Sequence, residues 1–335
     1  MPEYQVILFF RKPRFTANFS VETSFDRMAR CFPSSSAFRL SKHVLSHYSN
    51  GLLPRLRGIL EARSLRGDIN HVTGDVHYIT LGLPGKKTIL TIHDCGLMNH
   101  PNPLARWIRK WFWLKLPVRH CRYVTAVSEA TKSDIIRFTG CPPEKVIVIP
   151  TIISDGFRPV EKEFDERCPR ILHIGLSHNK NFERHVEALG GLNCRLHVIG
   201  NLESQHLRIL TQNQIQYTST YNISPADILR AYAESDLLLF ASTLEGFGMP
   251  ILEAQSVGRA VITSNLSSMP EVAGEGACYV DPYSVASIRD GILRIIQDSR
   301  YRDSLINHGF DNVRRFNPET VARQYEALYS GISVD

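Results

Sequence analysis

The chain has 335 residues, 43% of them hydrophobic and 21% charged, which favours two globular domains over one. Its seven cysteines include no CxxC pair, so neither a disulfide framework nor a structural zinc site is indicated, and a reducing cytosol fits best. Because no apolar run reaches the roughly 18 residues of a membrane span and no signal-peptide pattern opens the sequence, we expect a cytoplasmic protein.

Charge is distributed unevenly along the chain. Residues 1–160 hold 23 Lys and Arg against 11 Asp and Glu, a net charge of +12, and the rest hold 16 against 22, a net charge of −6. A basic half attracts phosphorylated acceptors, acidic lipid headgroups or nucleic acid, and charge alone does not choose among them. The two halves are expected to face different partners.

Short apolar runs alternate with segments of helical periodicity, the pattern of an α/β fold with parallel sheets. We predict strands at 5–10, 88–92, 123–127 and 146–149, and then at 170–174, 195–199, 216–219, 236–241, 260–263 and 278–280. A polar, proline-bounded linker between Ser154 and Pro169 separates the two sets. The sequence thus predicts two Rossmann-like, doubly wound domains at 1–155 and 165–317, with a terminal helix at about 318–335 that could pack back on the first domain.

His93 and Asp94 follow directly after the strand predicted at 88–92. Open α/β sheets bind ligands at the carboxyl ends of their strands, so both side chains are candidates for a site. The alternative for His93 is a buried imidazole satisfied by backbone groups.

Residues 106–120, RWIRKWFWLKLPVRH, contain all three tryptophans of the chain and six basic residues, if His120 is counted. Aromatic and basic side chains together are typical of a helix at an anionic membrane surface, where the inner face of the membrane would carry a lipid-linked acceptor. The alternative is a helix that packs its aromatics into the first domain and leaves its cations in solvent. Such side chains also bind single-stranded nucleic acid, but no other segment supports that, so we expect no nucleic-acid partner.

Residues 236–253, DLLLFASTLEGFGMPILE, run from an apolar strand through a glycine-bracketed turn into a helix whose first turn holds a proline. Gly246 and Gly248 let the backbone approach a ligand closely, and the start of a helix favours an anionic or hydroxyl-rich group. Glu245 in the turn and Glu253 in the helix can face the same strand ends. We therefore expect a ligand-binding turn here.

The spacing of Glu245 and Glu253 around GFGMP resembles the E-x7-E motif of the retaining, group 1 transferases of glycosyltransferase family 4, which have the GT-B fold. In the first half, TIHD at 91–94 and TAVSEATKSDI at 125–135 also resemble the family's acceptor-side domain. The resemblance covers most of the chain, and in the second half it continues through SPADILRAYAESDLLLFAS, EAQSVGRAVITSN and MPEVAGEGACYVDP. It implies that a nucleotide-sugar donor binds to the second domain, in the cleft that the first domain faces.

The resemblance also implies roles for single residues. Glu245 would bind donor-sugar hydroxyls and Glu253 the ribose hydroxyls, each carboxylate accepting two hydrogen bonds. The alternative for Glu253 is a carboxylate that is merely favoured by the helix dipole. Lys180, in HIGLSHNKNFERHVEAL, would be the diphosphate lysine, and Ile223 is a guess at the shelf under the base. The backbone of the turn would approach the sugar and diphosphate at Gly246, Phe247, Gly248 and Met249.

One phosphate cation of the family is missing, because Gly175 is followed by leucine and serine where many members have arginine. Arg11, Lys12 or Arg14 could replace it from across the cleft, or could form only a solvated turn. The segment from residue 11 to 32 also departs from the family's glycine-rich first turn, which leaves the acceptor class open.

The family's chemistry is retention without the carboxylate nucleophile of most retaining glycosidases. His93 would orient the donor sugar or stabilise an oxocarbenium-like transition state, and Asp94 would fix the tautomer of His93 or contact the acceptor. The leaving phosphate would take the acceptor proton while Lys180 holds its charge. The sequence has no DxD pair, so we expect no metal and no cofactor.

The predicted substrates are a UDP-, GDP- or ADP-sugar and a glycan or lipid-linked hydroxyl acceptor, in polysaccharide or glycolipid assembly by analogy only. Two alternatives are a GT-B nucleotide-sugar epimerase and a catalytically silent subunit that binds nucleotide sugar. Epimerases are expected to depart from the two-glutamate pattern, and silent relatives usually lose Lys180 or a glutamate. This chain keeps Lys180, Glu245 and Glu253.

Overall fold

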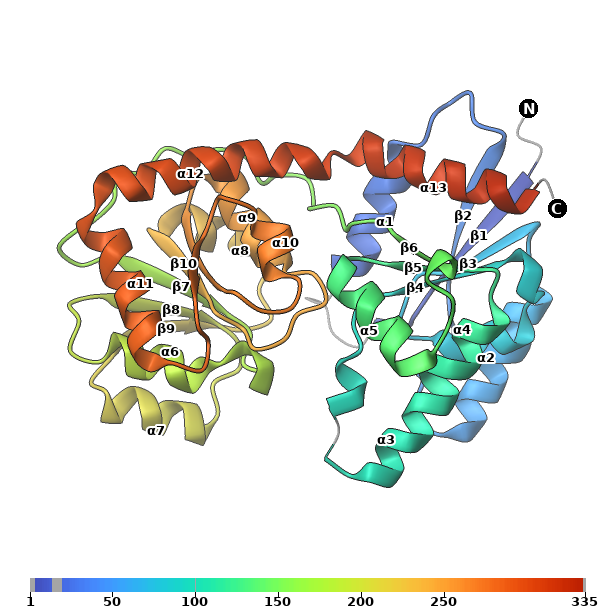
Figure 1. The fold of residues 1–335 in the computed structure, drawn as a ribbon, viewed down its shortest axis with the longest axis horizontal. Coiled ribbons are helices and arrows are strands. Elements are labelled where there is room, and N and C mark those ends of the chain that lie inside the picture. The colour runs from blue at the N-terminus through green and yellow to red at the C-terminus, as the bar shows by residue number, and fades with distance from the viewer. Residues whose placement is uncertain (1–3, 14–19, 100, 334–335) are drawn as a thin grey trace. The chain divides into compact units, whose positions relative to one another are not determined.

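A computed structural model of the protein describes residues 4–13, 20–99 and 101–333 (Figure 1). The chain forms two compact units, which we describe separately. The first comprises Met1–Ser154 and Phe316–Asp335, and the second comprises Asp155–Arg315.

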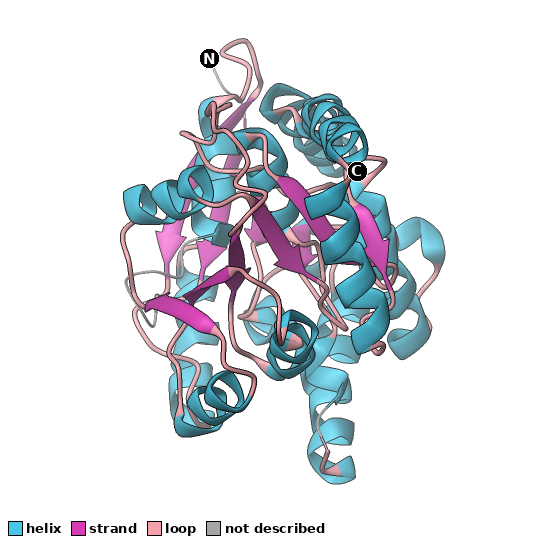
Figure 2. Ribbon diagram, turned by 90° about the vertical axis from the view of Figure 1, so that its left-hand side faces the viewer, coloured by secondary structure: helices cyan, strands magenta, loops and turns pink. Residues whose placement is uncertain are grey.

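The first unit is built on a six-stranded parallel sheet with helices packed around it (Figure 2). In sheet order its strands are β2 (Phe38–Val44), β1 (Tyr4–Phe10), β3 (Ile69–Val72), β4 (Thr88–Ile92), β5 (Tyr123–Ala126) and β6 (Val146–Val148). Its helices are α1 (Ser20–Arg30), α2 (Leu52–Ser64), α3 (Pro103–Arg109), a π-helical segment (Lys110–Lys115), α4 (Leu116–His120), α5 (Glu129–Thr139) and α13 (Pro318–Ser333). Short 3-10 turns lie at His77–Gly82, Gly85–Lys87, Gly96–Asn99 and Pro143–Lys145, and a further turn at Arg314–Phe316 spans the point in the sequence where the second unit ends and the first resumes.

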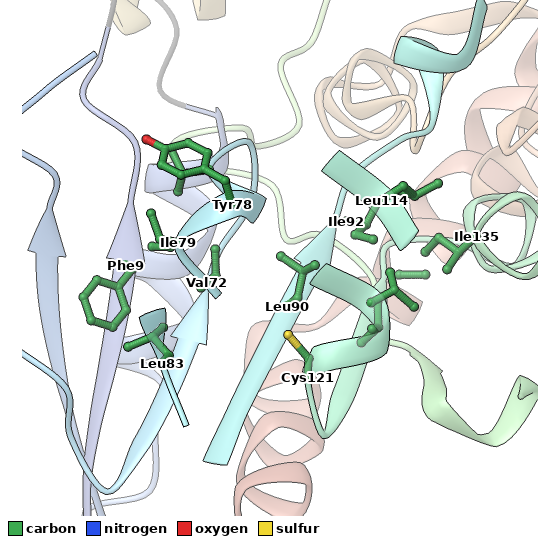
Figure 3. Close-up of a cluster of buried hydrophobic side chains, with 14 of the residues drawn as sticks. Phe9, Val72, Tyr78, Ile79, Leu83, Leu90, Ile92, Leu114, Cys121 and Ile135 are labelled. Atoms are coloured by element: carbon green, nitrogen blue, oxygen red, sulfur yellow. The ribbon is translucent and has the colours of Figure 1, made fainter. Parts of the chain in front are cut away.

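Both faces of this sheet are apolar, as expected for strands that helices cover on each side. Successive residues of β1 point to opposite faces, so Phe9 packs in one core cluster and Phe10 in the other. Figure 3 shows part of the first cluster, in which Leu90 and Ile92 of β4 lie near Leu114 and Ile135.

Helix α13 brings the end of the chain back to the first unit. Tyr325 and Tyr329 are buried against α1 and β3. His71 of β3 lies 2.8 Å through Nδ1 from the hydroxyl of Tyr329 and 2.7 Å through Nε2 from Thr91 Oγ1, which in turn lies 2.6 Å from Thr125 Oγ1. Burial lowers the pKa of His71 to about 3, so the imidazole is neutral. This buried polar chain fixes where α13 docks.

The second unit is also a six-stranded parallel sheet. In sheet order its strands are β12 (Cys278–Val280), β11 (Ala260–Ser264), β10 (Leu237–Phe240), β7 (Arg170–Ile174), β8 (Arg195–Ile199) and β9 (Gln216–Thr220). A 3-10 turn (His178–Lys180) precedes α6 (Phe182–Leu189), and the remaining helices are α7 (Ser204–Gln212), α8 (Pro225–Glu234), α9 (Met249–Val257), α10 (Met269–Ala273), α11 (Val285–Gln297) and α12 (Ser299–Val313).

All ten predicted strands are confirmed, with ends that differ by one residue at most. Two strands were missed. Strand β2 is an edge strand whose sequence, FRLSKHV, is half polar, and β3, INHV, buries Asn70 and His71 at its centre. Neither shows the apolar run by which the other strands were recognised. The predicted linker has no helix or strand and packs on the second unit, where Val160 N donates to Val257 O at 3.2 Å.

The docking of α13 can be tested by replacing Tyr329 with Phe. The variant leaves Nδ1 of buried His71 without its partner, so we expect the free energy of unfolding to fall by about 1–3 kcal/mol. Chemical denaturation measures the change. As a control, exposed Tyr283 replaced with Phe should shift stability by less than about 0.5 kcal/mol. Equal stabilities of the two variants would contradict the role given to this hydrogen bond.

Candidate active site

In the second unit the chain reverses its winding direction between β7 and β10, which are neighbours in the sheet. The loops after these two strands diverge, and ligands of open α/β sheets bind in the crevice that this leaves. Lys180 follows β7 and Glu245 follows β10, and Lys180 Nζ lies 2.7 Å from Glu245 Oε1. Both side chains are mostly buried. The structure therefore brings two of the predicted site residues into one ion pair at the switch point.

The position of Lys180 depends on the glycine that follows β7. Gly175 has φ +85°, and a Cβ on it would lie 3.1 Å from Lys180 Cε, so a side chain there would crowd the lysine. On its other side the ammonium group lies 4.5 Å from the ring centroid of Phe240. The aliphatic stem of the lysine is thus held between a glycine and an aromatic ring.

Two asparagines tie the β7 loop to the β10 loop. Asn179 Nδ2 donates to Leu244 O at 2.8 Å, and Thr243 N donates to Asn179 O at the same distance. Asn181, which has the left-handed φ of +61° before α6, donates to Ala241 O at 3.0 Å. Sequence analysis missed both residues, because a hydrogen bond between segments 60 or more residues apart leaves no local signal.

The turn between β10 and α9 has the shape that its glycines predict. Gly248 caps α9 with φ +104°, and a proline stands in the first helical turn. Ser267 Oγ lies 2.6 Å from Glu245 O, and Ser268 Oγ lies 3.0 Å from Glu245 O and 2.8 Å from Phe247 O. These hydroxyls fix the carbonyls of the turn, so the backbone of residues 245–249 is preorganised. Sequence analysis did not find the two serines.

Glu253 lies on α9 and accepts a hydrogen bond of 2.6 Å from the hydroxyl of buried Tyr232. Burial raises the pKa of Glu253 to about 7, although Tyr232 and the charge of Lys180 act to lower it. Glu253 is also beyond the first turn of α9. A carboxylate held there only by the helix dipole would lie in that first turn with a lowered pKa, so the geometry does not support this alternative.

The imidazole of His93, at the end of β4, is held by the backbone of the first unit. Its Nε2 lies 2.7 Å from Thr73 O, and Gly74, with φ +141°, makes room for the ring, since a Cβ there would lie 2.5 Å from His93 Cδ2. Because a carbonyl can only accept, Nε2 carries a proton, and in the neutral tautomer Nδ1 is then the acceptor. Asp94 does not set this tautomer: its Oδ1 accepts from Gly96 N at 2.7 Å.

Arg11 and its neighbours are not a cluster of unpaired cations. Arg11 is ion-paired with Asp75 and lies 3.5 Å from Glu22 Oε1, while Lys12 donates to Ser46 O at 3.1 Å. Arg14 is outside the described residues. Ile223, between β9 and α8, is partly buried, and its role toward a base remains a prediction.

Comparison with known families shows to which family the chain belongs. The family model described as glycosyl transferases group 1 matches residues 158–311, and that described as glycosyltransferase family 4 matches residues 4–156. The chain belongs to glycosyltransferase family 4. Together the two models cover most of both units of this glycosyltransferase, and residues 312–335, which include α13, lie outside both matches.

Individual relatives of this glycosyltransferase share about a quarter of its residues over the aligned regions. It is 24% identical over 272 residues to O-antigen chain mannosyltransferase B of Escherichia coli, with 71% of this chain and 69% of the relative covered. It is 27% identical over 313 residues to the MMP alpha-(1->4)-mannosyltransferase of Mycolicibacterium hassiacum, covering 82% of this chain and 74% of the relative.

Solved structures agree on the fold. Sucrose-phosphate synthase of Thermosynechococcus elongatus superimposes with a TM-score of 0.78 at 14% identity, covering 98% of this chain and 99% of that chain. HepE of Anabaena, solved with UDP and glucose, gives a TM-score of 0.78 at 15% identity, covering 98% and 100%. The two parallel α/β sheets of this glycosyltransferase are thus those of the GT-B fold.

The tryptophan-rich segment of the glycosyltransferase is helical and largely at the surface. Trp107, Trp111 and Phe112 are exposed, whereas Trp113 packs against Tyr78 with ring centroids 5.6 Å apart. The predicted alternative in which the aromatic side chains pack into the first domain therefore describes only part of the segment. Among the described residues, no helix is long and apolar enough to cross a bilayer, and no group of three or more His, Cys, Asp or Glu is placed to hold a metal ion.

The raised pKa of Glu253 can be tested by replacing the residue with Gln. Its folded-state pKa of about 7 exceeds the ordinary value of 4.5, so the folded chain binds this proton more tightly than the unfolded chain. The wild-type free energy of unfolding should therefore fall as pH rises from about 4.5 through 7. Glu253→Gln should lose that fall and exceed the wild type by on the order of 2 kcal/mol near pH 8, but not near pH 5.

Urea unfolding at both pH values, with exposed Glu183→Gln as control, measures this difference. The control should keep the wild-type dependence on pH. A Glu253→Gln variant whose stability runs parallel to the wild type across this range would show that the buried carboxyl is not the group that titrates.

Proposed function

We propose that this glycosyltransferase moves a hexose, most simply mannose, from a nucleotide-diphosphate sugar to a hydroxyl of a glycan or lipid-linked acceptor. The second unit binds the donor and the first unit binds the acceptor. The observation that carries the proposal is the cluster of Lys180, Glu245 and Glu253 at the switch point of the second sheet. Such a cluster provides one cation for a diphosphate and two carboxylates for hydroxyl groups.

The ion pair gives the donor site a resting state of balanced charge. Without donor, Glu245 neutralises Lys180. When a diphosphate arrives, Lys180 can turn its charge toward the phosphate oxygens, and the carboxylate of Glu245 becomes an acceptor for sugar hydroxyls. Glu253, whose Oε2 is taken by Tyr232, keeps Oε1 for the ribose. Each group thus has a partner both before and after the donor binds.

The names of the relatives suggest the sugar of the donor, but they do not suggest its nucleotide base. Two relatives are named as mannosyltransferases, and they share with this chain more than two thirds of their length. HepE, which has the same fold, was solved with UDP-glucose. The name of the Escherichia coli relative also supports a role in assembling a surface polysaccharide.

The proposed reaction is a front-face displacement with retention of the anomeric configuration. The bond between the anomeric carbon and the β-phosphate oxygen breaks, the acceptor oxygen bonds to the same face of that carbon, and the acceptor proton passes to the leaving phosphate. Lys180 stabilises the negative charge that grows on that phosphate. In the neutral tautomer with Nε2–H bonded to Thr73 O, Nδ1 of His93 can accept from a sugar hydroxyl and orient the ring. None of these steps requires a metal ion.

A membrane surface is the proposed location of the acceptor. Exposed Leu104, Trp107, Ile108, Trp111 and Phe112 recur at helical spacing, and no Asp or Glu occurs between residues 94 and 129. An apolar face flanked only by cations suits the headgroup region of an anionic bilayer.

Helix α2 extends this surface. Arg55 of α2 lies 4.5 Å from the ring centroid of Trp113, so α2 adjoins the tryptophan-rich segment (Figure 1). On α2 four leucines are exposed, and Arg57 and Arg63 stand among them. The leucines are Leu52, Leu53, Leu56 and Leu60.

The donor site can be tested by calorimetric titration of UDP-glucose, GDP-mannose and ADP-glucose, with and without EDTA. We expect one donor to bind, insensitive to EDTA. Lys180→Ala and Glu253→Ala should each weaken its binding at least tenfold, because a hydrogen bond to a charged group contributes about 1.5–3 kcal/mol. The matched controls are exposed Arg208→Ala on α7 and Glu183→Ala on α6, which should bind like the wild type.

If no nucleotide sugar binds, or if both site substitutions leave the Kd unchanged, the donor assignment is wrong. Binding without turnover would favour the silent subunit, and conversion of the donor without transfer would favour an epimerase. Where a product forms, proton NMR of its anomeric signal distinguishes retention from inversion.

The membrane surface can be tested with vesicles. We expect the wild type to sediment with vesicles that contain phosphatidylglycerol and not with phosphatidylcholine alone, and less so at high salt. Trp107→Ser with Phe112→Ser should weaken binding more than tenfold, since each buried aromatic contributes about 1.5–3 kcal/mol. Tyr283→Ser, an exposed aromatic of the second unit, is the control. A wild type that stays in the supernatant with anionic vesicles would rule this surface out.

A further inference from the structure

The first sheet has its own switch point, between β1 and β3, where the chain reverses its winding direction. Polar side chains gather at the carboxyl ends of three neighbouring strands there. Arg11 follows β1, Asp75 follows β3 and His93 follows β4. By the same rule that locates the donor site in the second sheet, this crevice is a place for a ligand.

Glu22 of α1 is the unusual member of this group. It is 5% exposed, and neither carboxylate oxygen accepts a hydrogen bond within the described part of the chain. Its charged neighbour Arg11 lies 3.5 Å away and is also paired with Asp75. A buried carboxylate that lacks hydrogen bonds is costly, so a fold keeps one where a ligand or a water supplies them.

Glu22 lines a cavity of about 10 Å³ together with Arg11, Asp75 and His93, among others. That volume holds a single water molecule, or the single hydroxyl oxygen that would displace it. Asp75 is half exposed and stands in a left-handed backbone conformation, with φ +54°, which is uncommon for a residue other than glycine. Such strained positions occur often at ligand sites.

The charge of the cluster selects the kind of ligand. One guanidinium against the two carboxylates of Glu22 and Asp75 leaves a net charge of −1. Among the described side chains of this cluster, two acids face one base, which disfavours a diphosphate. A neutral, hydroxyl-rich group can instead donate to both carboxylates.

We propose that Glu22 and Asp75 form the subsite that anchors the acceptor sugar, with one ring hydroxyl donating to Glu22 in the cavity and a neighbouring hydroxyl donating to Asp75 at its rim. This assignment rests on the proposed function, because it names the acceptor of that reaction as a pyranoside. The position of Glu22 also suits it, because Glu22 lies in the first turn of α1, where the helix dipole favours a carboxylate.

The test uses the full chain and methyl glycosides of mannose, glucose, galactose and N-acetylglucosamine as acceptor probes. Saturation-transfer NMR measures glycoside binding without any turnover, and calorimetry measures nucleotide-sugar binding separately. We expect Glu22→Gln to weaken binding of the preferred glycoside about tenfold or more and Glu22→Asp to weaken it less, with nucleotide-sugar binding unchanged. Asp26→Asn is the matched control, because Asp26 is on the same helix but is paired with Lys42.

A melting measurement separates this role from a structural one. Removing an unsatisfied buried charge should leave the Tm of Glu22→Gln at or above that of the wild type. A Tm lowered by several degrees, with glycoside binding intact, would make Glu22 only a structural partner of Arg11 and would overturn the proposal.

The remaining outcomes are also distinct. Equal glycoside binding by Glu22→Gln and the wild type would show that the cavity holds water only. Failure of the wild type to bind any of the glycosides, while it binds a nucleotide sugar, would overturn the subsite and leave the proposed donor site standing. Weakened nucleotide-sugar binding by Glu22→Gln would place Glu22 on the donor instead. Failure to bind any nucleotide sugar would overturn the proposed function, while the glycoside arm would still decide the role of Glu22.

Discussion

Each sheet of this glycosyltransferase reverses its winding direction between two adjacent strands, and this reversal decides where chemistry can take place. Connections leave β7 and β10 toward opposite sides, so the strand ends between them are not covered by a crossover. A cation and a carboxylate bridge the opening in each sheet, Lys180 with Glu245 in one and Arg11 with Asp75 in the other. The two crevices share this topology and differ in the charge that surrounds the bridge.

The crevice of the second sheet places ionisable groups where water is scarce, and the surrounding residues limit the energetic cost. Tyr232 gives Glu253 a hydrogen bond, Glu245 balances Lys180, and the pKa of Glu253 still rises to about 7. Such a site is less stable than an apolar one and is better prepared for a polar ligand, since its hydrogen-bonding groups need little reorganisation. The hydrogen bonds of Asn179 between the two loops have the same effect, because they hold the loop that carries Lys180 before any ligand binds.

Local sequence patterns predicted those features of the structure that depend on residues close together in the sequence. Apolar runs located ten strands, and the glycines and glutamates around Phe247 located the ligand turn. Strands β2 and β3 were not predicted. Strand β2 lies at an edge of the sheet, and β3 buries polar side chains in a hydrogen-bond network that ends at Tyr329, more than 250 residues away. The roles of Tyr232, Ser268 and Glu22 were not predicted for a related reason, because each role depends on a contact that forms only in the folded chain.

Among the described residues, the excess of positive charge in the first half is not concentrated at the crevice of the first sheet. Glu22 and Asp75 outweigh Arg11 there, whereas the cations of α2 and of residues 106–119 stand beside exposed leucines and tryptophans. A basic donor site would need cations near the strand ends, and a membrane-facing surface would need them beside apolar side chains. The distribution matches the second requirement. Since a lipid-linked glycan presents its sugar near a bilayer, a basic surface and a weakly acidic, hydroxyl-binding crevice on one unit would serve the same acceptor.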